Sequence, residues 1–413
     1  MPMATVAAIV IVWATFVWYL RKLRLQHIEK ICKRALARRR QKTKMSTDDS
    51  ILDSEGVYGS TWRVHNILTA LELKFEAWLA MSARGLFLTY GIPSISSVLH
   101  KTGGFQKDVH RRYADMELLI REFNDNAVDN CIHFDGQPER ARRAIERLNA
   151  IHNEYGSLIL YRDMMYVLAV FMTTPAIFAD SRWAWRKFTP DEKECIYYHW
   201  VDIGNMMNLR VEENFQGYED VLRYKYEYEK KYMRYSNSNK MLSHSTIDYF
   251  VNGVIWRPLR GIMKSTTLCI MSILQEREYQ SAALGLASTE EITRTRGEYW
   301  AIIYKVVHAI LFVVVDFTLC LKALITKYLF PPLPLSWMDR LAGKHAVGGD
   351  GSSKCPFSYR PNRDLDFNNR TYTKEGCKGD GEYVLEHMGP KHIRAGLMMS
   401  DPTYLGIKEG KVI

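Results

Sequence analysis

The chain has 413 residues and a mass of 48.0 kDa, and 47% of its residues are hydrophobic, including 12% that are aromatic. This composition excludes a mainly disordered protein and is sufficient for one large hydrophobic core or two ordinary ones. The formal net charge of +10 equals the basic excess within residues 21–44, where eleven Lys or Arg accompany one acid, so the rest of the chain is near neutral.

The N-terminus carries an apolar run, Met3 to Leu20, of 18 residues without a charge. This length is near the lower limit for a helix that spans a bilayer. Because the basic residues follow the run, the pattern indicates a retained anchor and not a cleaved signal peptide. A basic block beside a membrane span is typical of the cytosolic side and of contact with anionic lipid. We therefore predict a single-pass anchor at 1–21, a basic juxtamembrane segment at 22–60, a cytosolic body and no nucleic-acid binding.

Helical patterns follow one another through the body. Residues 61–85 have helical periodicity, and Pro93 and the pair Gly103-Gly104 then interrupt it. A strong amphipathic helix follows, with its apolar stripe at Val109, Tyr113, Met116, Ile120 and Phe123. Strand signals are weak throughout. The sequence therefore predicts an all-α domain at 61–330.

An arginine-rich helix is expected to begin near Pro138, where a proline in the first turn costs little. Its apolar stripe contains an imidazole, because the spacing places on one face Ala141, Ile145, Leu148, His152 and Tyr155. A lone histidine on such a face is most often a buried structural group. The alternative is a metal or haem ligand whose second ring nitrogen is held by a neighbouring acceptor. The stripe alone leaves both interpretations open.

Three further segments complete the expected organisation. The stretch Leu158–Pro175 is apolar nearly all round and is expected inside the core, with its end at the proline. Thr189–Glu192 forms a capping box that opens another helix. Val307–Ile325 is long enough to span a membrane, but it contains His308, Asp316 and Lys322, so we expect a buried or membrane-resting helix. Residues 331–413 are expected to form an irregular extension.

Several chemistries lack their motifs. No GxGxxG, GxxxxGK[ST], GxSxG, HExxH or ExxH pattern is present, which argues against dinucleotide, P-loop, α/β-hydrolase, zincin and di-iron carboxylate sites. Seven scattered cysteines without CxxC are typical of a reducing compartment and indicate neither a structural zinc site nor covalently attached haem. A histidine-ligated site on helices is the option that stays open.

The order of five segments resembles one family. TYGIPSISSVLHKTGGF, RRYADMELLIREF, LNAIH, DMMYVLAVFMTTPAIF and FTPDEKECIYYHWVDIGNMMNL follow one another as in the MpaB-type membrane-bound oxygenases and the bacterial rubber oxygenases. The resemblance covers residues 60–260 well and extends more loosely toward the C-terminus. It implies an all-α protein that binds haem b without a covalent bond.

The resemblance also implies a reaction and a set of site residues. Members cleave a carbon–carbon double bond of a lipophilic isoprenoid or prenyl chain with dioxygen. The resemblance also implies a location at the endoplasmic reticulum membrane, and it does not identify an electron donor. By position, His152 matches the iron ligand, and Arg112, Asp115 and Met116 match the residues that face the haem. Arg112 is expected to hydrogen-bond dioxygen or a haem propionate, or else to pair with Asp115. Met116 replaces a threonine of the family.

Two other interpretations stay open, and Met116 and the absence of a second obvious catalytic group motivate the first of them. The chain can be a degenerate, non-enzymatic family member that binds lipid or a protein partner at the membrane surface. A bound haem can also serve peroxidase-like chemistry, which hydrogen peroxide and not dioxygen would support. His199, on the capped helix, is interpreted as structural because the family does not require a histidine there.

Overall fold

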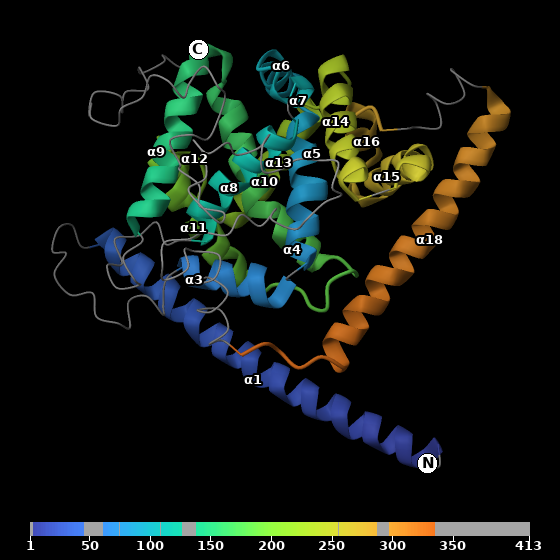
Figure 1. The fold of residues 1–413 in the computed structure, drawn as a ribbon. Helices are drawn as coiled ribbons and strands as arrows, with labels where there is room; N and C mark the ends of the chain where they lie inside the picture. Colours follow the sequence, from blue (N-terminus) through green and yellow to red (C-terminus); the bar gives the residue numbers. More distant parts are fainter. Residues whose placement is uncertain are drawn as a thin grey trace, which may run out of the picture.

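The computed structural model describes residues 3–44, 61–73, 75–107, 109–125, 138–254, 256–286 and 297–334, and within these ranges every regular element is a helix (Figure 1). The all-α prediction is confirmed. The first elements are α1 Met3–Lys44, α3 Thr61–Asn66, η1 Ile67–Leu73, α4 Phe75–Leu79, η2 Ala80–Gly85, α5 Leu86–Tyr90, α6 Pro93–Lys101, α7 Gly104–Lys107, α8 Val109–Asp125 and α9 Pro138–Tyr155. The others are η3 Gly156–Leu158, α10 Tyr161–Asp180, α11 Pro190–Met206, α12 Val211–Asn214, α13 Tyr218–Tyr232, α14 Asn237–Val254, η4 Arg257–Leu259, α15 Arg260–Leu274, α16 Glu278–Ala283 and α18 Glu298–Tyr328.

Helix α1 is one continuous helix with two different halves. Its N-terminal half extends away from the body in Figure 1 and exposes its apolar side chains. Its C-terminal half packs along α3 and α11, because apolar residues at helical spacing enter the main core. These core residues are Ile28, Ile31, Cys32, Ala35 and Leu36. The segment that was predicted as a basic juxtamembrane region is therefore, as far as Lys44, also a structural part of the body.

The segment from residue 61 to residue 90 is helical, as predicted for 61–85, but two of its pieces are π-helical. These pieces are η1 and η2. Wide helical turns of this kind are rare and frequently occur at functional sites. The chain breaks where Pro93 begins α6 and where Gly103 takes a positive φ of 68° before α7. Both interruptions were predicted.

Helix α10 lies inside the body between α11, α13 and η2, which confirms the predicted core position of this apolar stretch. It does not end at Pro175 but continues to Asp180. A proline inside a helix costs about 3 kcal/mol, and burial of the helix on several sides outweighs that cost. The two preceding threonines bond to the helix itself, since the hydroxyls of Thr173 and Thr174 donate to carbonyls one turn earlier, each at 2.7 Å.

The predicted capping box at the start of α11 is present. The Glu192 N–H donates to Thr189 Oγ1 at 3.3 Å, and the Thr189 N–H donates to Glu192 Oε2 at 2.7 Å. This reciprocal pair satisfies two backbone donors that would otherwise lack a partner at a helix N-terminus. It fixes where α11 begins and therefore which of its side chains face the interior.

Helix α18 is not buried, so the first of the two alternatives expected for Val307–Ile325, a buried helix, was wrong, and the second, a membrane-resting helix, stays a prediction. Only Ala301, Leu319 and Ala323 are buried along its 31 residues. By length and composition, three helices in the described part of the chain could cross a membrane: Met3–Arg40, Tyr161–Asp180 and Glu298–Tyr328. In the second helix, 72% of the 18-residue apolar stretch is buried inside the body. The corresponding stretches of the first and third helices are 6% and 11% buried.

Candidate functional site

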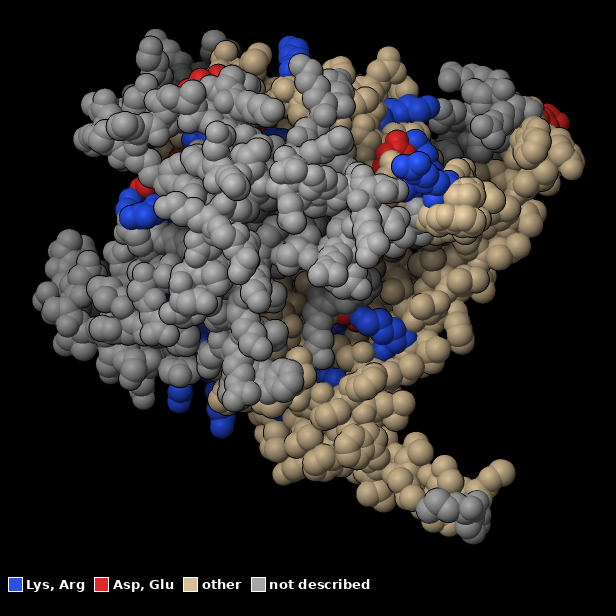
Figure 2. Space-filling view, in the orientation of Figure 1, with Lys and Arg blue, Asp and Glu red and all other residues tan. Residues whose placement is uncertain are grey.

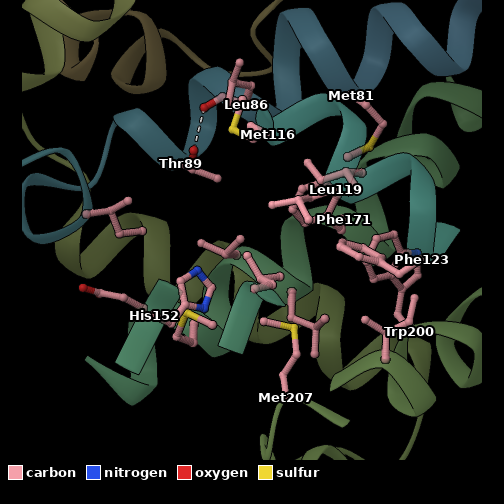
Figure 3. Close-up of a pocket in the computed structure, with 18 of the residues that line it drawn as sticks. Met81, Leu86, Thr89, Met116, Leu119, Phe123, His152, Phe171, Trp200 and Met207 are labelled. Atoms are coloured by element: carbon pink, nitrogen blue, oxygen red, sulfur yellow. Dashed lines mark hydrogen bonds between the residues drawn. The ribbon is translucent and has the colours of Figure 1, made fainter. Parts of the chain in front are cut away.

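A cavity of about 540 Å³ lies inside the helical body (Figure 3). Its walls come from α3, α5, α6, α8, α9, α10 and α11, with contributions from both π-helical pieces. The lining is mostly apolar, and Figure 3 shows Phe123, Phe171 and Trp200 gathered at one end. A cavity of this size and character is typical of a site for a small molecule or cofactor.

Helix α9 brings His152 to the cavity. Its stripe begins with Ala141 and Ile145, which are fully buried against the core, and ends with His152 and Tyr155, which line the cavity. Figure 3 shows the imidazole pointing into the cavity. The stripe that sequence periodicity predicted therefore divides into a packing part and a cavity part.

Four polar atoms at this cavity are buried without a hydrogen-bond partner among the described residues. They are His152 Nδ1, Arg112 Nε, Tyr155 Oη and Trp200 Nε1, and all four residues line the cavity. A buried polar atom that makes no hydrogen bond is unfavourable by about 1–3 kcal/mol, and such atoms are rare in native structures. Four of them around one mostly apolar space indicate a site that a polar or charged group completes.

The electrostatics keep His152 neutral. Burial, together with a smaller effect of the nearby Arg112 guanidinium, lowers its pKa from 6.5 to about 4. The ring is part-exposed, but it faces the cavity and not bulk water, so desolvation still governs it. A neutral imidazole is the form that binds a metal. The acceptor that was expected for the second ring nitrogen is not found in the described part of the chain, since Nδ1 has no partner there.

Helix α8 supplies the facing wall. Arg112 and Met116 line the cavity, and Figure 3 places Met116 across the space from His152. Asp115 lies on the same helix but is only 2% exposed and does not line the cavity. The structure therefore brings together His152, Arg112 and Met116, and it leaves Asp115 outside the lining.

Several polar residues of the cavity lining were not predicted, and Thr89 and Asp163 are two of them. Thr89, on α5, lies on the same wall as Met116 in Figure 3, and its hydroxyl donates to the Leu86 carbonyl at 2.7 Å. Asp163 is buried in the first turn of α10, and its carboxylate accepts a hydrogen bond from the Tyr228 hydroxyl. Acidic residues are common in the first turn of a helix, where they interact favourably with the helix dipole. The sequence therefore did not distinguish Asp163 from a surface residue.

A pair of stacked histidines lies at the cavity as well. His65, on α3, lines it, and its ring lies 4.4 Å from the ring of His199 with 27° between the planes. His199 is buried behind it and does not line the cavity. Burial holds the pKa of His199 well below its ordinary value, so that ring is neutral. No group of three or more His, Cys, Asp or Glu is arranged for a metal ion in the described residues.

The residues of the cavity fit a haem. A haem needs one axial imidazole from the protein and not a cluster of ligands, and His152 offers one in a dry space. The unpartnered Arg112 Nε provides a cationic donor in the same cavity. A guanidinium is well suited to bind a carboxylate such as a propionate.

Comparison with known proteins finds relatives over part of the chain. The protein named ER-bound oxygenase mpaB from Penicillium brevicompactum is 28% identical over 223 residues, which are 50% of this chain and 54% of that protein. The protein named ER-bound oxygenase mpaB' from the same organism is 31% identical over 180 residues, 40% of each chain. A third, ER-bound oxygenase mpaB from Penicillium roqueforti (strain FM164), is 31% identical over 162 residues, 36% of this chain and 51% of that protein.

This chain spans about half the length, or less, of these curated relatives. No family model matches it, and no solved structure matches it significantly. The resemblance that its helical segments indicated is nevertheless confirmed at the level of sequence: over 36–50% of its length, the chain is similar to proteins of the MpaB type that are named ER-bound oxygenases.

Proposed function

We propose that the protein is a membrane-anchored, haem b-dependent oxygenase of the endoplasmic reticulum. The observation that carries the proposal is the set of unpartnered polar atoms, with His152 among them, on the wall of a mostly apolar cavity. The names of the relatives support an oxygenase bound to the endoplasmic reticulum. The exposed apolar half of α1 supports attachment to a membrane.

His152 is the residue that would hold the iron. Its neutral ring is available near neutral pH because its pKa is about 4. Arg112 would bind an anionic group, since its charge persists in a low-dielectric cavity and its Nε has no partner among the described residues. When bound, the haem supplies the chemistry that activates dioxygen, and the protein contributes ligation, orientation and dryness.

The apolar walls fit a lipophilic substrate. Phe123, Phe171 and Trp200 form an aromatic end of the cavity, against which an extended hydrocarbon chain would pack. This supports oxidative cleavage of a double bond in an isoprenoid or prenyl chain with dioxygen. A membrane anchor suits such substrates because they partition into the bilayer.

Met116 favours a second candidate function. It places a thioether on the wall where the resembling family has a threonine hydroxyl, and so removes a polar group from the cavity. A protein without oxygenase activity would use the same cavity to hold a lipid at the membrane surface. Thr89 argues for the enzyme, since it restores a hydroxyl to the wall that carries Met116.

The test is the visible absorption spectrum of detergent-solubilised full-length protein, expressed with adequate iron, together with a pyridine haemochrome assay. We expect a b-type spectrum in the wild type that His152→Ala abolishes and that added imidazole restores. His65→Ala is the matched control, because it removes an imidazole from the same cavity and is expected to keep the spectrum. Circular dichroism establishes that each variant is folded.

Two results would overturn parts of this proposal. A folded wild type without haem would leave the lipid-binding candidate in its place. Turnover supported by hydrogen peroxide, and not by dioxygen, would replace the oxygenase with peroxidase-like chemistry.

A further inference from the structure

Helix α18 has a charged side that faces the body. Asp316 Oδ1 accepts from Arg182 Nη2 at 2.6 Å and from Trp183 Nε1 at 2.8 Å. Six residues further along the helix, Lys322 Nζ pairs with Glu76 Oε1 at 2.6 Å. Asp316 and Lys322, two of the residues that argued against a membrane span in the sequence, are thus turned toward the chain that follows α10 and toward α4.

The opposite side of α18 is apolar and unpartnered in the described structure. Its side chains recur at steps of three, four and seven, and each is more than half exposed: Ile302, Val306, Ile310, Val313, Phe317 and Leu324. We call these six residues the outer face of α18. Figure 2 shows the surface over α18 and over the free half of α1 as a largely uncharged band. Contiguous exposed apolar surface of this extent marks an interaction site.

The C-terminal end of α18 is fixed to α1 where α1 leaves the body. Trp13 Nε1 donates to the Leu329 carbonyl at 2.9 Å. Arg21 Nη2 donates to the carbonyls of Thr326 at 2.5 Å and Phe330 at 2.9 Å. Arginine at this place satisfies carbonyls that a helix C-terminus leaves unpaired. The outer face is therefore continuous with the apolar anchor.

Figure 1 shows how the two helices leave this junction. The free half of α1 extends away from the body, whereas α18 runs crosswise to it along the side of the body. If α1 crosses a bilayer, a helix that runs crosswise to α1 lies along the bilayer surface. Spanning by α18 is disfavoured, because Arg182 and Glu76 of the body would have to enter the hydrocarbon with their partners on α18.

We propose that α18 lies in the plane of the membrane with its outer face inserted among the lipids of the leaflet nearest the body. It makes a second membrane contact beside α1 and fixes how the body is rotated on the bilayer. An interfacial helix needs an apolar face toward the acyl chains and polar groups on the other side, and α18 has both once its partners on the body are counted. The inference rests on the proposed anchoring by α1 and not on the haem.

The test places a small environment-sensitive fluorescent amino acid, by nonsense suppression, at one position at a time in the full-length protein. The positions are Ile302, Val313 and Leu324 along the outer face, and Glu213 on α12, whose side chain is 68% exposed, is the control. The protein is reconstituted in vesicles of phosphatidylcholine and phosphatidylserine. Quenchers are attached to the lipids either near the headgroup or at the middle of the acyl chain.

We expect the three positions of the outer face to be quenched strongly and to a similar extent by the shallow quencher, and the Glu213 position to be quenched by neither. Quenching no stronger than at Glu213 would show that α18 does not contact lipid. Deepest quenching at Val313, with less at both ends, would show a spanning helix. Weak quenching at the outer face that becomes strong when the protein is diluted over more vesicles would show that a second copy of the chain covers this face. Each of these three results overturns the proposal, and none depends on whether haem is bound.

Discussion

Arg112 and His152, on the neighbouring helices α8 and α9, line the same cavity, and the guanidinium of Arg112 lowers the pKa of the His152 imidazole. A positive neighbour disfavours protonation, so removal of the charge raises the pKa. We expect Arg112→Gln to raise the pKa of His152 above about 4 in haem-free protein, while it stays below 6.5 because desolvation persists. Arg112→Lys keeps the charge and is the control. NMR titration of the His152 ring measures its pKa in both variants. An unchanged pKa in Arg112→Gln would show that the Arg112 charge does not act on His152.

The same pKa predicts how stability depends on pH. His152 has a folded pKa of about 4 against an ordinary value of 6.5, so the unfolded chain binds a proton more readily between these values. Stability is therefore lost as pH falls through this window, by about 3 kcal/mol for this group alone. We expect the Tm of the wild type to fall more than the Tm of His152→Gln when the pH is lowered from 6.5 to 4. Burial also lowers the pKa of His199, but His199 is present in both proteins, so its effect on the difference cancels. A difference that does not change with pH would mean that His152 is not desolvated.

The prediction of local structure from the sequence succeeded where the signal lies within one helix. The stripe that ends in His152 and Tyr155 needs only helical periodicity, and the capping box at Thr189 needs only four consecutive residues. The end of α10 was missed because its continuation past Pro175 depends on burial by helices far away in the sequence. The exposure of α18 was missed for the same reason, since two of its charges, Asp316 and Lys322, are paired with Arg182 and Glu76, which are distant in the sequence.

The site was predictable in part. His152, Arg112 and Met116 came from the order of segments that resemble a family, and the structure places all three on one cavity. Thr89 and Asp163 carry no motif, because each is one polar residue in a helix whose neighbours do not mark it. Only the packing of α5, α8 and α10 around a common space shows that they belong to the site.

The hydroxyl of Thr89 is expected to act where the family has a threonine and this chain has Met116. Thr89→Val removes the hydroxyl but keeps the shape of the side chain. In reduced, haem-loaded protein exposed to carbon monoxide, we expect this variant to shift the C–O stretching band, because that band responds to the dipoles of polar groups near the ligand, including a hydroxyl whose proton is donated to the Leu86 carbonyl. Met116→Thr in the Thr89→Val background is expected to move the band back. Ser94→Ala, elsewhere in the cavity lining, is the matched loss of a hydroxyl and should leave the band in place. If Thr89→Val does not move the band, Thr89 does not serve the reaction.

The capping box predicts a measurable contribution to stability. Thr189→Ala removes the oxygen that accepts from the Glu192 N–H at 3.3 Å, and loss of such a cap costs about 1 kcal/mol. Thr189→Ser keeps the oxygen and is expected to retain most of the stability. We expect a lower Tm for the alanine variant with an unchanged content of helix by circular dichroism. Equal Tm values for the two variants would show that the start of α11 is held by packing alone.

Asp316 distinguishes a helix that packs on the body from one that prefers the bilayer core. In the structure its carboxylate accepts from Trp183 Nε1 and Arg182 Nη2, although Arg182 is 60% exposed, so solvent screens that ion pair. Asp316→Leu leaves the indole donor without its acceptor and should cost about 1–2 kcal/mol. We therefore expect the variant to unfold at a lower temperature in detergent and to detach α18 more readily, which protease cleavage near the start of the helix would report. Asp316→Asn keeps an acceptor for the indole and should therefore lose less stability than Asp316→Leu. A helix that crossed the bilayer would behave in the opposite way, because removal of a charge from its middle would stabilise it.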